Sequence, residues 1–136
     1  MKFNDKIARV AEFHGHLGPY LIVGMKMGEF SNELLGKETG AGKGHFHKKA
    51  VVKTGTTPPL SCIIDGIQFT SGCTLGKGNI EVLNQQKPEV TFTAEEKQVT
   101  LRLKIKIETA NRDLEEVARD IFKKLPADLF TIIKNF

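Results

Sequence analysis

The pattern of hydrophobic positions predicts helices at the start of the chain, short strands in the middle and helices again at the end. Apolar residues recur every three or four positions over residues 3–13 and 19–35, as on the apolar face of a helix. Over residues 97–108 they alternate with polar residues, which predicts a strand with one buried and one solvated face. This order of elements favours an α+β fold, with an antiparallel-rich sheet covered by helices on one face.

The remaining predicted elements are strands near 47–53, 80–83 and 89–93, a capped helix from Asn111 and a last short helix from Pro126 to Phe136. The chain of 136 residues has no internal repeat and no linker, so we expect one domain over 1–136 that buries its own core. The apolar face of the 99–107 strand and a groove at Gly24 and Gly28 leave more apolar surface than one such domain covers. We therefore predict a homodimer with intertwined protomers.

Reactive side chains are concentrated in the segment 62–79, which has the sequence CIIDGIQFTSGCTLGKGN. Two thiols, a carboxylate, an amide, a hydroxyl and a lysine occur there among small and apolar residues. The pattern predicts a helix over 62–71, with capping threonines and two prolines before it at 56–59. On this helix Asp65 lies one turn from Cys62, so its carboxyl group must be hydrogen-bonded, paired with a charge, or raised in pKa.

Cys62 and Cys73 lie eleven residues apart. On one straight helix their sulfurs would be about 16 Å apart, at 1.5 Å per residue. That separation excludes a disulfide, whose Cα atoms lie within about 7 Å, and equally excludes one shared zinc ion. The thiols meet only if the chain reverses at Ser71 and Gly72, which glycine permits. Cys62 is therefore either a reactive or metal-binding thiol, or a small buried hydrophobic residue.

His14 and His16 are separated by one glycine, and Pro19 follows as the first residue of the predicted second helix. Neutral imidazole is a common metal ligand, and histidine titrates near pH 7. The two histidines are therefore either metal ligands or groups that cap the helix and satisfy buried carbonyls. A second pair, His45 and His47, is expected at the surface.

The turn over 74–79 has the composition of an anion-binding site. Its glycines allow successive backbone N–H groups to face one concavity, and its lysine adds a positive charge. The expected anion-binding residues are Gln68, Thr74, Gly76, Gly78 and Asn79, with Lys77 as the cation. They predict a small anionic ligand whose other end reaches Cys62 and His16. The alternative is a solvated glycine turn.

Composition narrows the functional classes. The 20 basic and 16 acidic residues give a net charge of +4, which does not indicate a nucleic-acid partner. No apolar run approaches the about 20 residues of a membrane span, and no secretory signal is visible, so we expect a cytoplasmic protein with no membrane partner. The glycine-lysine stretches lack the spacing of a phosphate loop, no Cys-x-x-Cys occurs, and no serine lies on a nucleophile elbow.

Two separated motifs carry a resemblance to a known family. They are His14-Gly-His16-x-x-Pro19 and Cys62-x-x-Asp65-x-x-Gln68-x-x-x-Gly72-Cys73-Thr74-x-Gly76-Lys77-x-Asn79. Together they make residues 8–83 similar to FmdE, the family of small proteins that accompany formylmethanofuran dehydrogenase. The resemblance implies an α+β core, often a homodimer, with a cleft lined by cysteines and histidines that holds a transition metal such as zinc. It also implies an association with the molybdenum or tungsten enzyme of methanogenesis, but no particular reaction.

The chain departs from that family in two ways. Gly18 stands where the family has a cysteine, and the cysteine-rich C-terminal zinc domain of many members is not expected here. We predict a metal- or cofactor-binding protein of this type, or alternatively a stand-alone metal-dependent or thiol-dependent enzyme acting on a small anionic substrate. The expected metal ligands are His14, His16, Cys62 and Cys73, and the expected catalytic residues are Cys62, Asp65 and Lys77.

Overall fold

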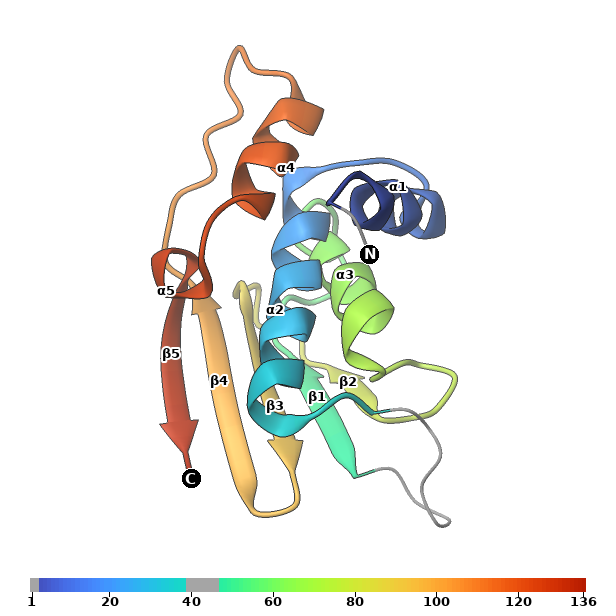
Figure 1. Cartoon of the computed structure of the whole chain (residues 1–136), viewed down its shortest axis with the longest axis vertical. Helices are drawn as coiled ribbons and strands as arrows, with labels where there is room; N and C mark the ends of the chain where they lie inside the picture. The colour runs from blue at the N-terminus through green and yellow to red at the C-terminus, as the bar shows by residue number, and fades with distance from the viewer. Residues whose placement is uncertain (1–2, 39–46) are drawn as a thin grey trace.

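A five-stranded sheet with helices on one face forms the framework of the protein (Figure 1). The computed structural model describes residues 3–38 and 47–136. The elements are α1 (Phe3–His14), α2 (Pro19–Leu35), β1 (Lys48–Val52), α3 (Cys62–Ser71), β2 (Ile80–Val82), β3 (Glu89–Ala94), β4 (Lys97–Leu103), α4 (Leu114–Phe122), α5 (Pro126–Leu129) and β5 (Phe130–Asn135). No helix within these described ranges is long and apolar enough to cross a membrane.

The sheet has the strand order β2-β1-β3-β4-β5. β1 pairs with β2 in parallel, and the other three pairs are antiparallel. This confirms the predicted α+β class and a sheet that is rich in antiparallel pairs, although it is mixed. The side chains of β4 alternate as predicted, since Val99, Leu101 and Leu103 are buried against the helices while Arg102 is exposed.

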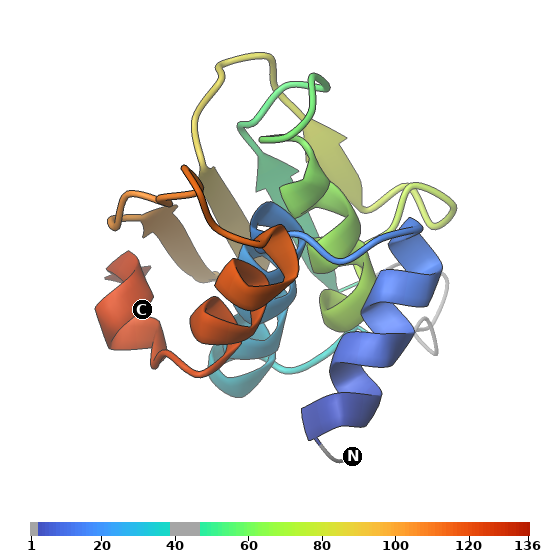
Figure 2. The same cartoon turned by 90° about the horizontal axis from the view of Figure 1, so that it is seen from above.

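The other face of the sheet is polar, as the alternation of β4 predicts. Glu89 is paired there with Lys53 and Arg102. The hydroxyl groups of Thr91 and Thr100 lie 2.8 Å apart across neighbouring strands. Helices therefore cover only one side of the sheet, as Figure 2 also shows from above.

α2 packs along α3, and glycines bring their backbones together (Figures 1 and 2). A Cβ atom added at Gly24 would overlap the carbonyl group of Ile63, and one at Gly66 would overlap the carbonyl group of Leu21. A Cβ at Gly28 would likewise overlap Thr70. The glycine groove predicted on α2 is thus filled by α3 of the same chain. It is not free surface for a second copy, so this part of the argument for a dimer is wrong.

Two predicted elements differ in the structure. The strand predicted over 97–108 ends at Leu103, because the next residues leave the sheet and run to α4. The helix predicted from Pro126 to Phe136 is one helical turn followed by the edge strand β5, in which Ile132 pairs with Leu101. Pairing with β4 decides the conformation there, since strand preference depends on neighbours more than on the local sequence.

Two predicted helix starts also differ. Neither threonine before α3 caps it, because Ser61 occupies the N-cap position and its side chain makes no capping bond. The cap of α4 is Asp113, whose carboxylate accepts from the N–H of Glu115, and not Asn111. Of the second histidine pair, His47 is exposed, and His45 lies outside the described residues.

Candidate functional site

The end of α1 meets the first turn of α3 through a histidine and a carboxylate. His14 Nδ1 lies 2.6 Å from Asp65 Oδ2, and the His14 side chain is only 11 % exposed. His14 Nε2 is buried, and no described residue offers it a hydrogen-bond partner. Because Asp65 accepts a hydrogen bond from Nδ1, the neutral ring presents the lone pair of Nε2. A buried acceptor in that state is an unused ligand position.

His16 stands beside His14, with the ring centroids 4.7 Å apart. The side chain is exposed, because the turn between α1 and α2 carries it outward. Gly18 follows in an extended conformation that any residue can adopt, and a Cβ atom there would lie 3.6 Å from His16 Nε2. The missing side chain at Gly18 therefore leaves open space next to the imidazole.

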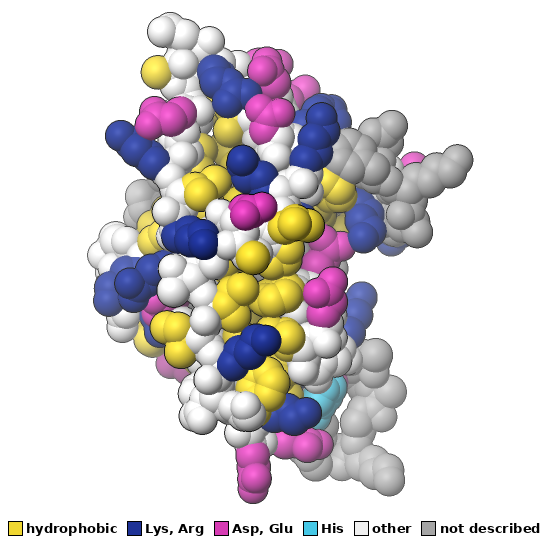
Figure 3. Space-filling view, turned by 60° about the vertical axis from the view of Figure 1, so that its left-hand side comes forward, with side chains coloured by type: hydrophobic (Ala, Val, Ile, Leu, Met, Phe, Trp, Pro, Cys, Tyr) yellow, Lys and Arg dark blue, Asp and Glu magenta, His cyan; other side chains and the backbone are white. Residues whose placement is uncertain are grey.

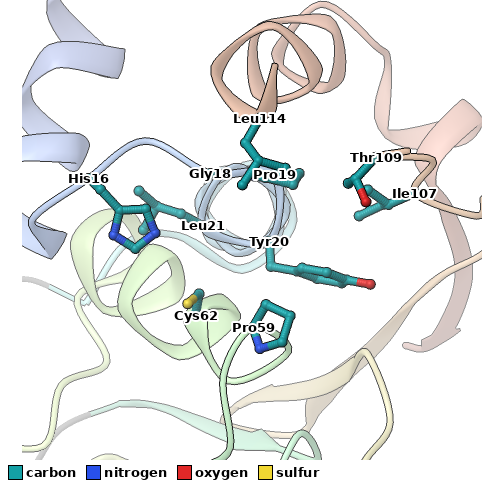
Figure 4. Close-up of a pocket in the computed structure, with 10 residues that line it drawn as sticks. All are labelled: His16, Gly18, Pro19, Tyr20, Leu21, Pro59, Cys62, Ile107, Thr109 and Leu114. Carbon is teal, nitrogen blue, oxygen red and sulfur yellow. The ribbon is translucent and has the colours of Figure 1, made fainter. Parts of the chain in front are cut away.

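Cys62 lies where two cavities meet. The first, which we call the α2 cavity, has a volume of about 350 Å³ and lies at the N-terminal end of α2 (Figure 4). Its lining residues are His16, Gly18, Pro19, Tyr20, Leu21, Pro59, Cys62, Ile107, Thr109 and Leu114. The second has a volume of about 290 Å³ and includes both His14 and Asp65 in its lining. The predicted association of Cys62 with the histidine turn is thus present in the structure.

The Cys62 thiol is not activated by its surroundings. Burial raises its pKa, and the nearby carboxylate of Asp65 raises it further. The thiol is half-buried and therefore protonated at neutral pH in the protein without a bound metal. This contradicts the expectation that the start of a helix or Lys77 lowers the pKa of Cys62.

Cys73 lies at the other end of α3 from Cys62. The ten residues of α3 separate the two thiols by about 14 Å, at 1.5 Å per residue. The chain does turn at Gly72, where φ is 81°, but it leads toward β2 and not back to Cys62. Cys73 is fully buried, and burial raises its pKa. The expectation that it joins one metal site with the histidines is wrong.

The turn over 74–79 also lies at that far end, so Lys77 does not face Cys62. Its hydrogen-bonding groups are already used within the protein. The N–H groups of Thr74 and Lys77 donate to Asn79 Oδ1 and Thr74 Oγ1, and that of Gly78 donates to the Thr74 carbonyl group. The Asn79 side chain in turn donates to the carbonyl groups of Lys48 and Gly72. The geometry therefore does not support an anion-binding concavity.

Gln68 connects the two ends of α3. Its Nε2 donates to Asp65 Oδ1 at 3.3 Å, and its Oε1 accepts from the N–H of Leu75 at 2.9 Å. This places Gln68 as support for the carboxylate that orients His14. It is not placed to bind an anion in the turn.

Four residues of the α2 cavity had no place in the predicted site: Tyr20, Ile107, Thr109 and Leu114. Tyr20 was detectable, because it is the only tyrosine of the chain and directly follows the histidine turn. The other three lie about 90 residues further along the chain, and no local pattern connects them with His16.

The donors at this site fit a metal ion in part. His14 Nε2, His16 and Cys62 are nitrogen and sulfur donors of the kind that zinc prefers. Among the residues described, however, no group of three or more His, Cys, Asp or Glu side chains is arranged to hold a metal ion. A closed structural zinc site is therefore not supported, whereas an open site completed by water or a ligand is compatible with the donors.

The fold and the site define a class of protein: an α+β domain in which a His-x-His turn packs against a cysteine-bearing helix beside a small-molecule cavity. Residues 13–129 match the family described as FmdE, Molybdenum formylmethanofuran dehydrogenase operon. The chain belongs to this FmdE family, as its motifs predict.

Two known proteins resemble the chain. A probable S-adenosyl-L-methionine-binding protein of Archaeoglobus fulgidus is 27 % identical over 125 residues, which cover 91 % of this chain. The chain spans only 33 % of the length of that relative. A tungsten formylmethanofuran dehydrogenase FmdE-like protein from Syntrophus aciditrophicus has the same fold, with a TM-score of 0.65 at 15 % identity over 99 % of this chain and 72 % of that one.

Proposed function

We propose that this chain is a metal- and ligand-binding protein of the FmdE family, in which His14, His16 and Cys62 hold a divalent transition metal such as zinc beside the α2 cavity. The observation that carries this proposal is the buried Nε2 of His14, which has no partner among the described residues. Its other ring nitrogen is held by Asp65 at 2.6 Å, as the carboxylate partners of metal-binding histidines are.

The chain's own residues would divide the work as follows. Asp65 fixes the tautomer and orientation of His14, and Gln68 holds Asp65. Cys62 would bind as a thiolate, since metal binding displaces the thiol proton despite its raised pKa. When bound, the metal would supply a Lewis acid with an open coordination position. The space at Gly18 leaves room for water or a ligand atom at that position.

The biological setting that we propose is metabolism of the formylmethanofuran dehydrogenase type, with the chain as an accessory or binding component of a molybdenum or tungsten enzyme in the cytoplasm. Family membership and the fold of the Syntrophus protein support this setting. The alternative, a stand-alone enzyme for a small anionic substrate, has less support. The thiol of Cys62 is not activated, and the donors of the 74–79 turn are used internally.

We further propose that the chain forms a homodimer through the free edge of β5. This strand pairs with β4 on one side only (Figure 1). Three exposed apolar side chains lie on or near it, with exposures of 58 % for Ile133, 58 % for Phe136 and 65 % for Leu125. Figure 3 shows apolar side chains along this side of the molecule. An unpaired edge of this kind is a template for pairing with another strand.

Metal content tests the central proposal. Protein purified without chelator should contain a transition metal, and both His14→Ala and Cys62→Ser should lose most of it, because an open site cannot spare one of its few ligands. His47→Ala is the matched control, since His47 is exposed and away from the site. Circular dichroism establishes that each variant is folded. Folded His14→Ala and Cys62→Ser proteins with the metal content of the parent would refute the metal site.

A further inference from the structure

The α2 cavity is lined without charged carboxylate, ammonium or guanidinium groups. Its ten lining residues, all within the described ranges, include no Asp, Glu, Lys or Arg (Figure 4). Moving a carboxylate or phosphate from water into such surroundings is unfavourable unless a partner charge compensates. The volume of about 350 Å³ is within the range of about 300–1,000 Å³ that is typical of small-molecule sites. The cavity is therefore large enough for a ligand but lacks the partner for a strongly charged one.

We infer that the α2 cavity binds an uncharged heteroaromatic ring. This inference rests on the proposed function and names the ligand class of the same site. It replaces the small anion expected from the 74–79 turn, because that turn lies at the opposite end of α3 and its donors are satisfied.

The walls of the cavity suit a flat apolar body. Tyr20 presents an aromatic ring, and Pro59 lies beside it in the lining (Figure 4). Leu21, Ile107 and Leu114 add aliphatic surface. Aromatic rings stack on or pack edge-to-face against such side chains and bury apolar area as they do so.

Polar atoms lie at two separate ends of this apolar space. Figure 4 shows the Tyr20 hydroxyl directed away from Cys62, on the side where Thr109 lies. Within the described residues, no hydrogen bond is made by the side-chain hydroxyl of either Tyr20 or Thr109. Each can therefore donate to a ring nitrogen or a carbonyl oxygen of a ligand. A ring with such an acceptor would be oriented by these hydroxyls, and its other end would lie toward Cys62 and His16.

Matched pairs of ligands test the charge preference. Nicotinamide and nicotinate have nearly the same shape but differ in charge, and adenosine and AMP differ by a phosphate group. Calorimetric titration of the parent protein at pH 7 should show that the uncharged member of at least one pair binds 10-fold or more tightly than its charged counterpart. Charged members that bind as tightly or more tightly would overturn the inference, as would a failure of all four compounds to bind at millimolar concentration.

Variants then place the binding in the α2 cavity. Leu114→Trp should abolish binding of the uncharged compound, because the larger side chain fills the cavity, and Leu114 is exposed enough at 48 % to be replaced without disturbing the core. Leu75→Trp makes the same change at a 78 % exposed position near the far end of α3 and should bind as the parent does. Tyr20→Phe keeps the ring but loses one donor, so affinity should fall about 3- to 10-fold. Unchanged affinity in Leu114→Trp would overturn the inference.

The result can be separated from the metal proposal. If the uncharged ring still binds to Cys62→Ser protein, the inference stands whether or not that variant has lost metal. If the parent binds metal through His14 and Cys62 but no ring, the inference is wrong and the metal site stands.

Discussion

Lys48 allows a quantitative test of the buried polar cluster at the C-terminal end of α2. Its residue is 1 % exposed, and its ammonium group donates to Ser31 Oγ at 2.7 Å, Asn32 Oδ1 at 2.9 Å and the Gly36 carbonyl at 3.0 Å. Burial lowers the pKa of Lys48 from 10.5 to about 8, and the opposing effect of nearby Cys73 is smaller. The folded protein therefore disfavours the charged form relative to the unfolded chain.

The sign of the pH dependence follows from this shift. Between pH 8 and 10.5 the unfolded chain binds more protons at this site than the folded protein, so the free energy of unfolding rises with pH. A shift of 10.5 − 8 = 2.5 pKa units corresponds to roughly 3 kcal/mol in total. Of this, about 2.5 kcal/mol is gained between pH 7 and pH 10.

Lys48→Met removes the titrating group and is the perturbation to compare. Urea unfolding of the parent and of Lys48→Met at several pH values from 7 to 10 should show the stability difference shifting in favour of the parent by roughly 2–3 kcal/mol. Lys87→Met is the control, because Lys87 is exposed, and its difference from the parent should stay nearly constant. A parent-to-Lys48→Met difference that does not change with pH would refute the argument from burial.

Three further predictions concern the helix contact and the site. Gly66→Ala should destabilise the protein by about 1–3 kcal/mol or more in thermal or urea unfolding, because its Cβ overlaps the backbone of α2, whereas Gly76→Ala has no atom within 4 Å and should be near neutral; equal effects would contradict the contact. Asp65→Asn should speed alkylation of Cys62 at pH 8, since removing the carboxylate lowers the thiol pKa, and an unchanged rate would contradict that electrostatic effect. Gly18→Cys should raise the metal content measured after dialysis, because a new thiol would lie next to an imidazole nitrogen, and unchanged content would count against the open position.

Local sequence determined the helices that build the site. α2 and α3 have the predicted bounds, Pro19–Leu35 and Cys62–Ser71. Helix hydrogen bonds join residues four apart, so the information for a helix is contained within it and in its flanking glycine and proline residues. The two motifs were likewise legible without a structure, and they indicated the FmdE family correctly.

Strand pairing, in contrast, was decided by the tertiary structure. The segment after Pro126 has apolar residues that suit a helix, yet it forms β5 because β4 offers it a pairing edge. The alternation after Leu103 continues in the sequence, but β5 ends its pairing with β4 at Phe130, and the chain leaves the sheet. Such contacts join residues that are far apart in the chain, and a local pattern does not contain them.

The site shows the same division. His14, His16 and Cys62 could be selected from the sequence by residue type and spacing. Only the tertiary structure joins His14 to Asp65 across 51 positions and leaves its Nε2 buried without a described partner. It also carries Cys73 and the 74–79 turn to the other end of α3, because a rigid helix of ten residues keeps its two ends apart. Proximity in sequence brought these groups into one predicted cleft, and the length of the helix separates them.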